Sequence, residues 1–250
     1  MKFLKIPHLP EGVVTHVLID KYAYDETFDI LHNLKIETVL VEKCQDVMDA
    51  ISSHPDIFYF HFGGNKMVVA PNADVNTRDI LKKIGFEIYV GKSILKRNYP
   101  YDVAYNIARL GDYVVHNFRC TDEVALTLIE GEKLKKINVL QGYTKCSILI
   151  VDKNAIITSD RGIAKFLLQH DFDVLLIKEG YIELTGLNYG FIGGCGGFVL
   201  KNLFLFNGDI TKHPNYSDIK NFFNKYNKEI IYINNKPLKD IGSIIPLCEK

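Results

Sequence analysis

The chain has 250 residues, of which 47% are hydrophobic and 24% are charged, as in an average globular protein. Lysine and arginine together number 30, and so do aspartate and glutamate, so no net charge attracts the chain to nucleic acid or to an anionic membrane. No apolar stretch approaches the roughly 18 residues of a membrane span, and Pro7 interrupts the start before a signal peptide could form. We therefore expect a cytoplasmic protein with no nucleic-acid or membrane partner, and the oligomeric state stays open.

Along the chain, a helix that ends in a polar turn and leads into a strand of branched apolar residues is predicted repeatedly. Clear copies occupy residues 30–41, 80–90, 166–177 and 222–233, and a weaker copy runs from 121 to 140. In the last helix, Ile219, Phe222, Phe223 and Tyr226 stand at i, i+3, i+4 and i+7, which is typical of one face packed on a sheet.

Two further strands precede these passages. An apolar strand is predicted before each helix, at residues 13–19, 67–70, 113–115, 155–157 and 203–206. Four of these five strands have a leading strand in front of them, at residues 57–60, 103–108, 147–151 and 189–192, joined by a tight turn as a hairpin. The first unit lacks a leading strand, and residues 243–247 at the other end of the chain could supply it.

Five ββαβ units with meeting termini describe one closed, pseudo-fivefold ring of the α/β class, a five-bladed propeller that spans residues 1–250 as a single domain. Closure would remove exposed sheet edges. The competing interpretation is an ordinary doubly wound α/β sheet, but a hairpin before every helix does not fit strict βαβ alternation.

The cysteines are Cys44, Cys120, Cys146, Cys195 and Cys248, an odd number without a C-x-x-C pair, so we expect free thiols in a reducing compartment. The histidines lack the spacing of metal ligands, and neither a P-loop nor a G-x-G-x-x-G fingerprint is present. We therefore expect no metal and no cofactor.

The pattern resembles the pentein, or α/β-propeller, fold of the guanidino-group-modifying enzymes, which include deiminases, dimethylarginine hydrolases and amidinotransferases. The resemblance in architecture covers essentially the whole chain. Three short motifs look like a clostridial-type branch of that superfamily: His54-Pro55-Asp56, Gly63-Gly64-Asn65 and the glycine-rich run from Gly193 to Gly197.

The resemblance implies a cysteine that attacks a guanidinium carbon, a histidine that moves protons and carboxylates that hold the cation. This chain departs from the usual motifs in two places. Phe62-Gly63-Gly64-Asn65 keeps the glycines of the second unit but replaces both acids, and Tyr143-Thr144-Lys145 stands where the fourth unit would open with His-x-Asp.

Cys195 is the candidate nucleophile. Two glycines on each side allow unusual backbone angles and close approach of a ligand. Neighbouring N–H groups could stabilise a developing anion or lower the pKa of the thiol. The competing interpretation is that the glycines pack tightly at a crowded ring axis and that Cys195 is a small buried hydrophobe. Cys248, which follows the proposed closing strand, is the second candidate.

His54 and Asp56 are the candidate general acid/base and the carboxylate that orients it. The competing interpretation is ordinary helix-to-strand turn chemistry. Asn65, Asn106 and Arg109 are candidate substrate contacts, because they lie at strand ends or turns that a ring brings toward its axis. Arg109 would suit a substrate carboxylate or a structural acid.

Two functions follow from this reading. The first is a cysteine-dependent hydrolase or transferase that acts on a small guanidine-type molecule, as the resemblance implies. The alternative is a non-catalytic pentein that binds a protein or ribonucleoprotein partner through one face of the ring.

Overall fold

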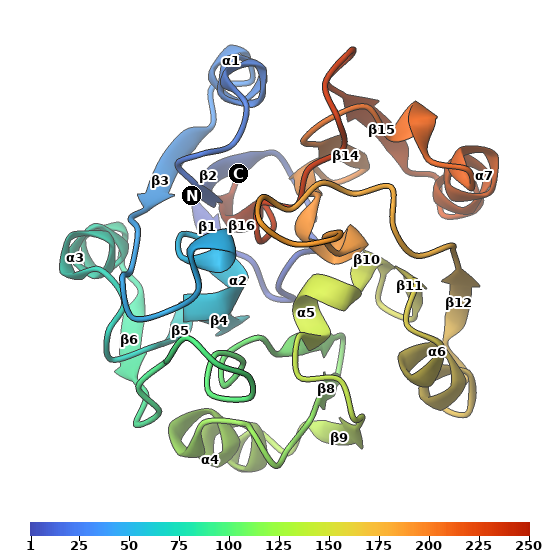
Figure 1. Ribbon diagram of the computed structural model, residues 1–250. Helices are drawn as coiled ribbons and strands as arrows, with labels where there is room; N and C mark the ends of the chain where they lie inside the picture. Colours follow the sequence, from blue (N-terminus) through green and yellow to red (C-terminus); the bar gives the residue numbers. More distant parts are fainter.

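The computed structural model covers residues 1–250 and contains five small sheets around one axis, with a helix on the outer side of each (Figure 1). In every blade the leading strand pairs antiparallel with a middle strand, which pairs parallel with an outer strand. The helix lies in the crossover between the two parallel strands. The predicted propeller of five ββαβ units is thereby confirmed.

The blades follow one another along the chain. The first contains β2 (Val14–Asp20), α1 (Asp25–Asn33) and β3 (Glu37–Val41). The second contains β4 (Tyr59–Gly63), β5 (Lys66–Val69), α3 (Val75–Ile84) and β6 (Glu87–Val90). The third contains β7 (Ala108–Leu110), β8 (Tyr113–His116), α4 (Glu123–Gly131) and β9 (Lys135–Asn138). The fourth contains β10 (Leu149–Asp152), β11 (Ala155–Thr158), α6 (Arg161–Leu168) and β12 (Asp173–Leu176). The fifth contains β13 (Gly196–Leu200), β14 (Leu203–Phe206), α7 (Tyr216–Lys225) and β15 (Glu229–Tyr232).

The two ends of the chain complete the first blade and close the ring. The last strand, β16 (Ile245–Glu249), pairs antiparallel with β2, and the short β1 (Lys2–Phe3) pairs with the other edge of β16. The side chain of Glu249 is buried and accepts hydrogen bonds from the backbone N–H groups of Glu11 at 2.6 Å and Gly12 at 2.7 Å. The predicted closing strand is therefore present, although it begins two residues later than expected and contains Cys248.

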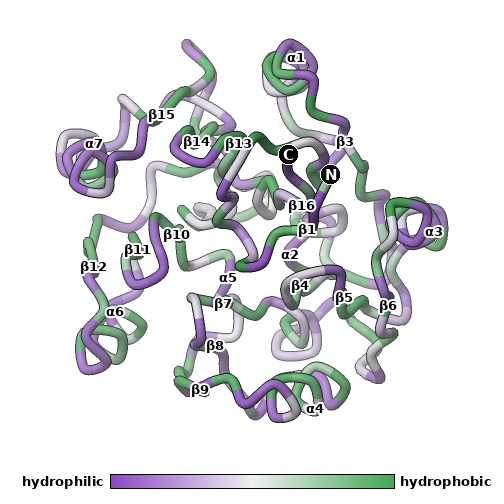
Figure 2. The backbone as a smooth tube through the Cα atoms, turned by 180° about the vertical axis from the view of Figure 1, so that it is seen from behind, coloured by the Kyte–Doolittle hydropathy of each residue, from purple (hydrophilic) through white to green (hydrophobic).

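The amphipathic helices pack as their sequence periodicity indicates. Ile219, Phe222 and Phe223 of α7 are buried, and Asp160 caps α6 by accepting a hydrogen bond from the backbone N–H of Ile163 at 2.8 Å. The apolar core lies between the sheets and these helices. Hydrophobic and hydrophilic stretches alternate along the outer helices (Figure 2). No helix has the length and apolar character needed to cross a membrane.

The leading strands begin later than the sequence predicts, most clearly in the fifth blade. A strand was expected at residues 189–192, but β13 begins at Gly196 and a single 3-10 turn precedes it. Residues 57–58 are likewise helical where a strand was expected. The reason is that the ring axis is buried, so turns that lie there carry the same apolar residues as a strand.

We predict that Glu249→Ala lowers the free energy of unfolding by about 2–3 kcal/mol, because the backbone N–H groups of Glu11 and Gly12 would lose a buried, charged acceptor. Chemical denaturation of the purified variant would measure this loss. Glu229→Ala, at an exposed position of β15, is the matched control and should stay within about 0.5 kcal/mol of the parent. Equal effects of the two substitutions would contradict a closing role for Glu249.

A second prediction concerns pH. Burial lowers the pKa of both His61 and His116 to about 4. The unfolded chain takes up these protons near pH 6.5, whereas the folded protein does so only near pH 4. Their contribution to stability is therefore present above pH 6.5 and is lost as the pH falls to 4, with a slope of up to about 1.4 kcal/mol per pH unit for each residue.

Denaturation curves between pH 4 and 7 for the parent and His116→Gln would measure this slope. The variant should show a shallower loss, whereas His170→Gln, at an exposed position, should follow the parent curve. A slope that is the same in all three proteins would contradict the assignment.

Candidate active site

Five short turns, one before the leading strand of each blade, meet at the ring axis. They are α2 (Pro55–Phe58), the turn at 103–106, α5 (Thr144–Ser147), the 3-10 turn η2 (Ile192–Gly194) and the turn at 240–243. Because these turns lie inside the ring, their polar side chains are buried and bind to groups on other blades.

Asp56, Asn106 and Cys146 join three blades. The Asn106 amide nitrogen lies 3.0 Å from the backbone oxygen of Asp56 and 3.0 Å from Cys146 Sγ, and its oxygen accepts from the Cys146 backbone N–H at 3.1 Å. The Cys146 thiol lies 3.2 Å from Asp56 Oδ1. Each of these residues is at most 2% exposed, so the cluster is almost completely buried.

Lys145 is a buried cation at the same axis. Its Nζ donates to the backbone oxygen of Gly193 at 3.0 Å and to Ser243 Oγ at 2.8 Å. Ser243 Oγ lies 2.8 Å from Asp56 Oδ2 and 2.9 Å from the Gly193 oxygen, so its single proton has two acceptors. The ammonium group therefore reaches the Asp56 carboxylate through one hydroxyl. Burial lowers the pKa of Lys145, and the charge of Asp56 opposes that effect.

An unusual backbone places the Ser243 hydroxyl there. Gly242 and Ser243 have φ angles of 62° and 78°, in the left-handed region, which costs a serine on the order of 1 kcal/mol. A β-carbon at Gly242 would overlap the His54 side chain. Gly242 of this turn therefore packs against His54, and Ser243 places its hydroxyl at the ring axis.

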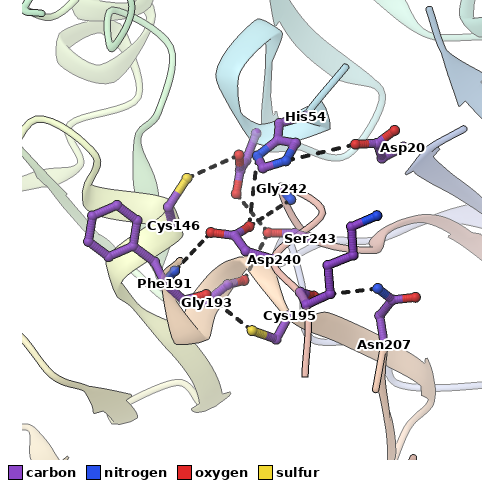
Figure 3. A network of polar contacts seen from close by, with 12 residues as sticks. Asp20, His54, Cys146, Phe191, Gly193, Cys195, Asn207, Asp240, Gly242 and Ser243 are labelled. Carbon is purple, nitrogen blue, oxygen red and sulfur yellow. Dashed lines mark hydrogen bonds and ion pairs between the residues drawn. The ribbon is translucent and has the colours of Figure 1, made fainter. Parts of the chain in front are cut away.

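His54 lies between two carboxylates (Figure 3). Its Nε2 is 3.8 Å from Asp20 Oδ2 and its Nδ1 is 3.8 Å from Asp240 Oδ1, too long for direct hydrogen bonds. His54 is only 3% exposed, and its Nδ1 has no hydrogen-bond partner. His54 is therefore paired with Asp20 and Asp240, whereas Asp56, its expected orienting carboxylate, contacts Cys146 and Ser243 instead.

Asp240 is held in place by backbone donors. It accepts hydrogen bonds from the N–H groups of Phe191 at 2.8 Å and Gly242 at 3.0 Å. Burial raises the pKa of the Asp240 carboxyl, and the nearby Asp56 raises it further, while His54 acts in the opposite direction. The axis holds three buried carboxyl groups, on Asp20, Asp56 and Asp240, beside one buried lysine, Lys145.

Two cavities meet at His54 and Asp240. The apolar chamber, of about 340 Å³, is lined by Cys146, by the aromatic rings of Tyr143, Tyr189 and Phe191, and by aliphatic side chains. The polar chamber, of about 240 Å³, is lined by Asp20, Asp49, Lys43, Lys239, Ser52 and Ser53. His54, Asp240 and Leu184 line both chambers. Leu184 belongs to a loop fixed to the ring by a hydrogen bond from the Glu183 N–H to the Leu238 oxygen at 2.7 Å.

The thiols differ in their access to these chambers. Cys146 lines the apolar chamber, and burial together with the charge of Asp56 raises its pKa well above the usual value. Cys195 lines neither chamber, is completely buried, and its Sγ donates to the Phe191 oxygen at 3.2 Å. Cys248 is buried on β16, where burial raises its pKa to about 11.

The glycine-rich run provides close packing. A β-carbon at Gly193 would overlap the backbone oxygens of Lys145, Cys146 and Ile148, and one at Gly194 would overlap the Asp240 carboxylate. These contacts agree with the packing interpretation of the run, in which Cys195 is a small buried residue. The role of Cys195 as a nucleophile stays a prediction.

Of the expected substrate contacts, only Asn106 lies in the central cluster. Asn65 is exposed in the β4–β5 turn, with its amide 3.5 Å from the Gly85 oxygen. The Arg109 guanidinium is half-buried and donates to the backbone oxygens of Phe62 and Gly111. It therefore stabilises the contact between the second and third blades and does not face either chamber.

Sequence reasoning missed Asp20, Lys145, Cys146, Asp240 and Ser243. One signal could have found Lys145. His54 and Tyr143 both precede a four-residue helix, so Asp56 and Lys145 are the second residues of equivalent helices in two blades. Opposite charges at equivalent positions of two blades predict that Asp56 and Lys145 lie close to each other at the ring axis. No group of three or more His, Cys, Asp and Glu is arranged to hold a metal ion.

The ring of five ββαβ blades is the pentein fold, and solved structures share the arrangement. An agmatine deiminase of C. jejuni with substrate bound has a TM-score of 0.57 at 12% identity, with 99% of this chain and 96% of that chain covered. The inosamine-phosphate amidinotransferase StrB1 of Streptomyces griseus has a TM-score of 0.56 at 10% identity, with 94% and 91% covered. The amidinotransferase SxtG of Microseira wollei has a TM-score of 0.54 at 11% identity, with 92% and 91% covered. At these identities the likeness establishes the fold.

The chain belongs to the family described as a family of unknown function (DUF6873), whose model matches residues 18–245. The search of curated proteins found no match to the sequence.

The buried charges generate a third prediction. Lys145→Met leaves the Asp56 carboxylate without its cation and should lower the free energy of unfolding by about 3–5 kcal/mol. Asp56→Asn should also destabilise, but the double variant Lys145→Met/Asp56→Asn should lose less than the sum of the single losses, because neither charge is then left unpaired. Denaturation of all three variants measures this coupling. Strictly additive losses would show that the two charges do not interact.

Proposed function

We propose that the protein is a cysteine-dependent hydrolase or transferase that acts on a small guanidine-type cation, with Cys146 as the nucleophile. One observation carries the proposal: three buried carboxylates, Asp20, Asp56 and Asp240, surround a histidine and a thiol, and the only buried ammonium group among them is Lys145. A cationic ligand would compensate this excess of negative charge.

The walls of the apolar chamber support a planar cation. Tyr143, Tyr189 and Phe191 offer ring faces on which a guanidinium group can stack. Asp240, which lines the same chamber, offers carboxylate oxygens to the N–H groups of the guanidinium. The volume of about 340 Å³ suits a small molecule.

The proposed reaction begins with transfer of the Cys146 proton to Asp56, whose Oδ1 lies 3.2 Å from the thiol. The thiolate then forms a bond to the guanidinium carbon. One C–N bond breaks as the leaving nitrogen takes a proton from His54, which gives a covalent thiouronium-like intermediate. Water or an amine next attacks the same carbon and returns a proton to His54. The C–S bond breaks, and the thiolate recovers its proton from Asp56.

A thiol-directed amidine tests this assignment. In a Cys44→Ser/Cys120→Ser background, which removes the two more exposed thiols, we expect a haloacetamidine to label Cys146 faster than the uncharged haloacetamide does. Peptide mapping by mass spectrometry identifies the site. Asp240→Asn keeps the side-chain shape and should abolish the preference for the cation.

Labelling of Cys195 in place of Cys146 would return the role to the residue first expected from the sequence. Equal rates with the amidine and the amide would contradict a cation site beside Cys146.

Binding without turnover is a second candidate function, and one observation favours it. The pKa values of Cys146 and Cys195 are both raised well above the usual value by burial, which disfavours the thiolate that a nucleophile requires. A guanidine ligand that binds but yields neither ammonia, urea nor a transferred amidino group would establish this candidate.

A further inference from the structure

We infer that the polar chamber is a second ligand site, which binds a small amine that carries an anionic tail. This inference goes beyond the proposed function, because the chamber can bind its ligand whether or not Cys146 supports turnover.

The first observation is the distribution of charge in the chamber. The carboxylates of Asp20 and Asp240 lie at its buried end, with side-chain exposures of 5% and 1%. Lys43, with a side chain 46% exposed, and the half-buried Lys239 line the same cavity closer to solvent. The chamber is therefore acidic at its inner end, whereas its outer end carries two lysines and a single exposed carboxylate, Asp49. A ligand with separated charges matches this arrangement if its ammonium group enters first.

The second observation is independent of the acidic residues. His54 lines the chamber, is 3% exposed, and its Nδ1 has no hydrogen-bond partner. The carboxylates on either side of the ring are 3.8 Å away, which leaves room for their oxygens to accept hydrogen bonds from a ligand. A primary ammonium group has three donors and can bind Asp20 and Asp240 together.

The outer lysines keep hydrogen-bonding capacity for an anion. Lys239 Nζ donates to the Tyr22 backbone oxygen at 3.1 Å and has two further N–H groups. Lys43 Nζ lies 3.9 Å from a carboxylate oxygen of Asp49, a long and solvent-exposed pair that a ligand carboxylate can replace at small cost. The apolar chamber has no lysine or arginine in its lining, so an anionic tail finds cations only in the polar chamber.

The test is a titration of the intact protein with ω-amino acids of increasing length: 3-aminopropanoate, 4-aminobutanoate and 5-aminopentanoate. Each is compared with the alkylamine that lacks its carboxylate and the carboxylate that lacks its amine. Isothermal calorimetry measures the affinities. We expect at least one amino acid to bind about tenfold more tightly than both of its matched compounds, because only it satisfies both ends of the chamber.

Three variants locate the site. Lys43→Met and Lys239→Met should each weaken binding of that amino acid by about threefold and leave the affinity for the matched alkylamine unchanged. Lys83→Met, at an exposed position of α3 away from both chambers, is the control and should bind like the parent. The lysine side chains reach solvent, so these variants should keep the fold, which circular dichroism checks.

The inference is overturned if no amino acid binds more tightly than its matched singly charged compounds. It is equally overturned if the folded Lys43 and Lys239 variants bind like the parent. Neither result depends on labelling of Cys146 by an amidine. Failure of the second site and failure of the proposed function are therefore separate outcomes.

Discussion

A buried lysine at the centre of the ring, bridged to a buried aspartate by one serine hydroxyl, is the interaction on which the rest of the site depends. Lys145 comes from the fourth blade, Ser243 from the first and Asp56 from the second, and the fifth blade contributes the Gly193 oxygen as another acceptor. Asn106 of the third blade binds the backbone of Asp56. Every blade thus supplies a group to one dry network. Because a half-satisfied network of this kind is costly, closure of all five blades is what satisfies its buried polar groups.

This network also determines the shape of the surrounding backbone. The glycines before β13 are required where a β-carbon would overlap the carbonyl oxygens of α5, and the left-handed turn at Gly242 and Ser243 carries the bridging hydroxyl to the axis. Strain in that turn is maintained because its neighbours over-determine it: His54 lies against Gly242, and the hydroxyl has two acceptors. The same turn, Gly242 and Ser243, therefore provides both close packing against His54 and the hydroxyl of the polar network.

The candidate site next to this network contains more buried carboxyl groups than buried lysines. Lys145 compensates one carboxylate, and Asp20 and Asp240 are left on either side of His54. His54 borders both an apolar chamber that contains a thiol and a polar chamber whose lining includes Lys43, Lys239 and Asp49. The proposed guanidine chemistry and the proposed amine site use the same physical fact, which is that buried negative charge favours a cation. The two proposed sites differ in their other lining residues, which are aromatic rings in the apolar chamber and lysines in the polar chamber.

The sequence by itself determined the architecture, because the period of the apolar residues and the repeated polar turns depend on local structure. The hairpins and the outer helices followed from residues close together in the chain, and the closing strand followed from the missing leading strand of the first unit. The first positions of the leading strands did not, since a buried turn has the same composition as a buried strand.

Only the tertiary structure decided the site. Asp56 lies 90 residues from Cys146 and 187 from Ser243 in the chain, and His54 is flanked by Asp20 and Asp240 rather than by its sequence neighbour Asp56. Which polar groups meet at the axis depends on how five blades are rotated around it, and no local pattern of residues contains that rotation.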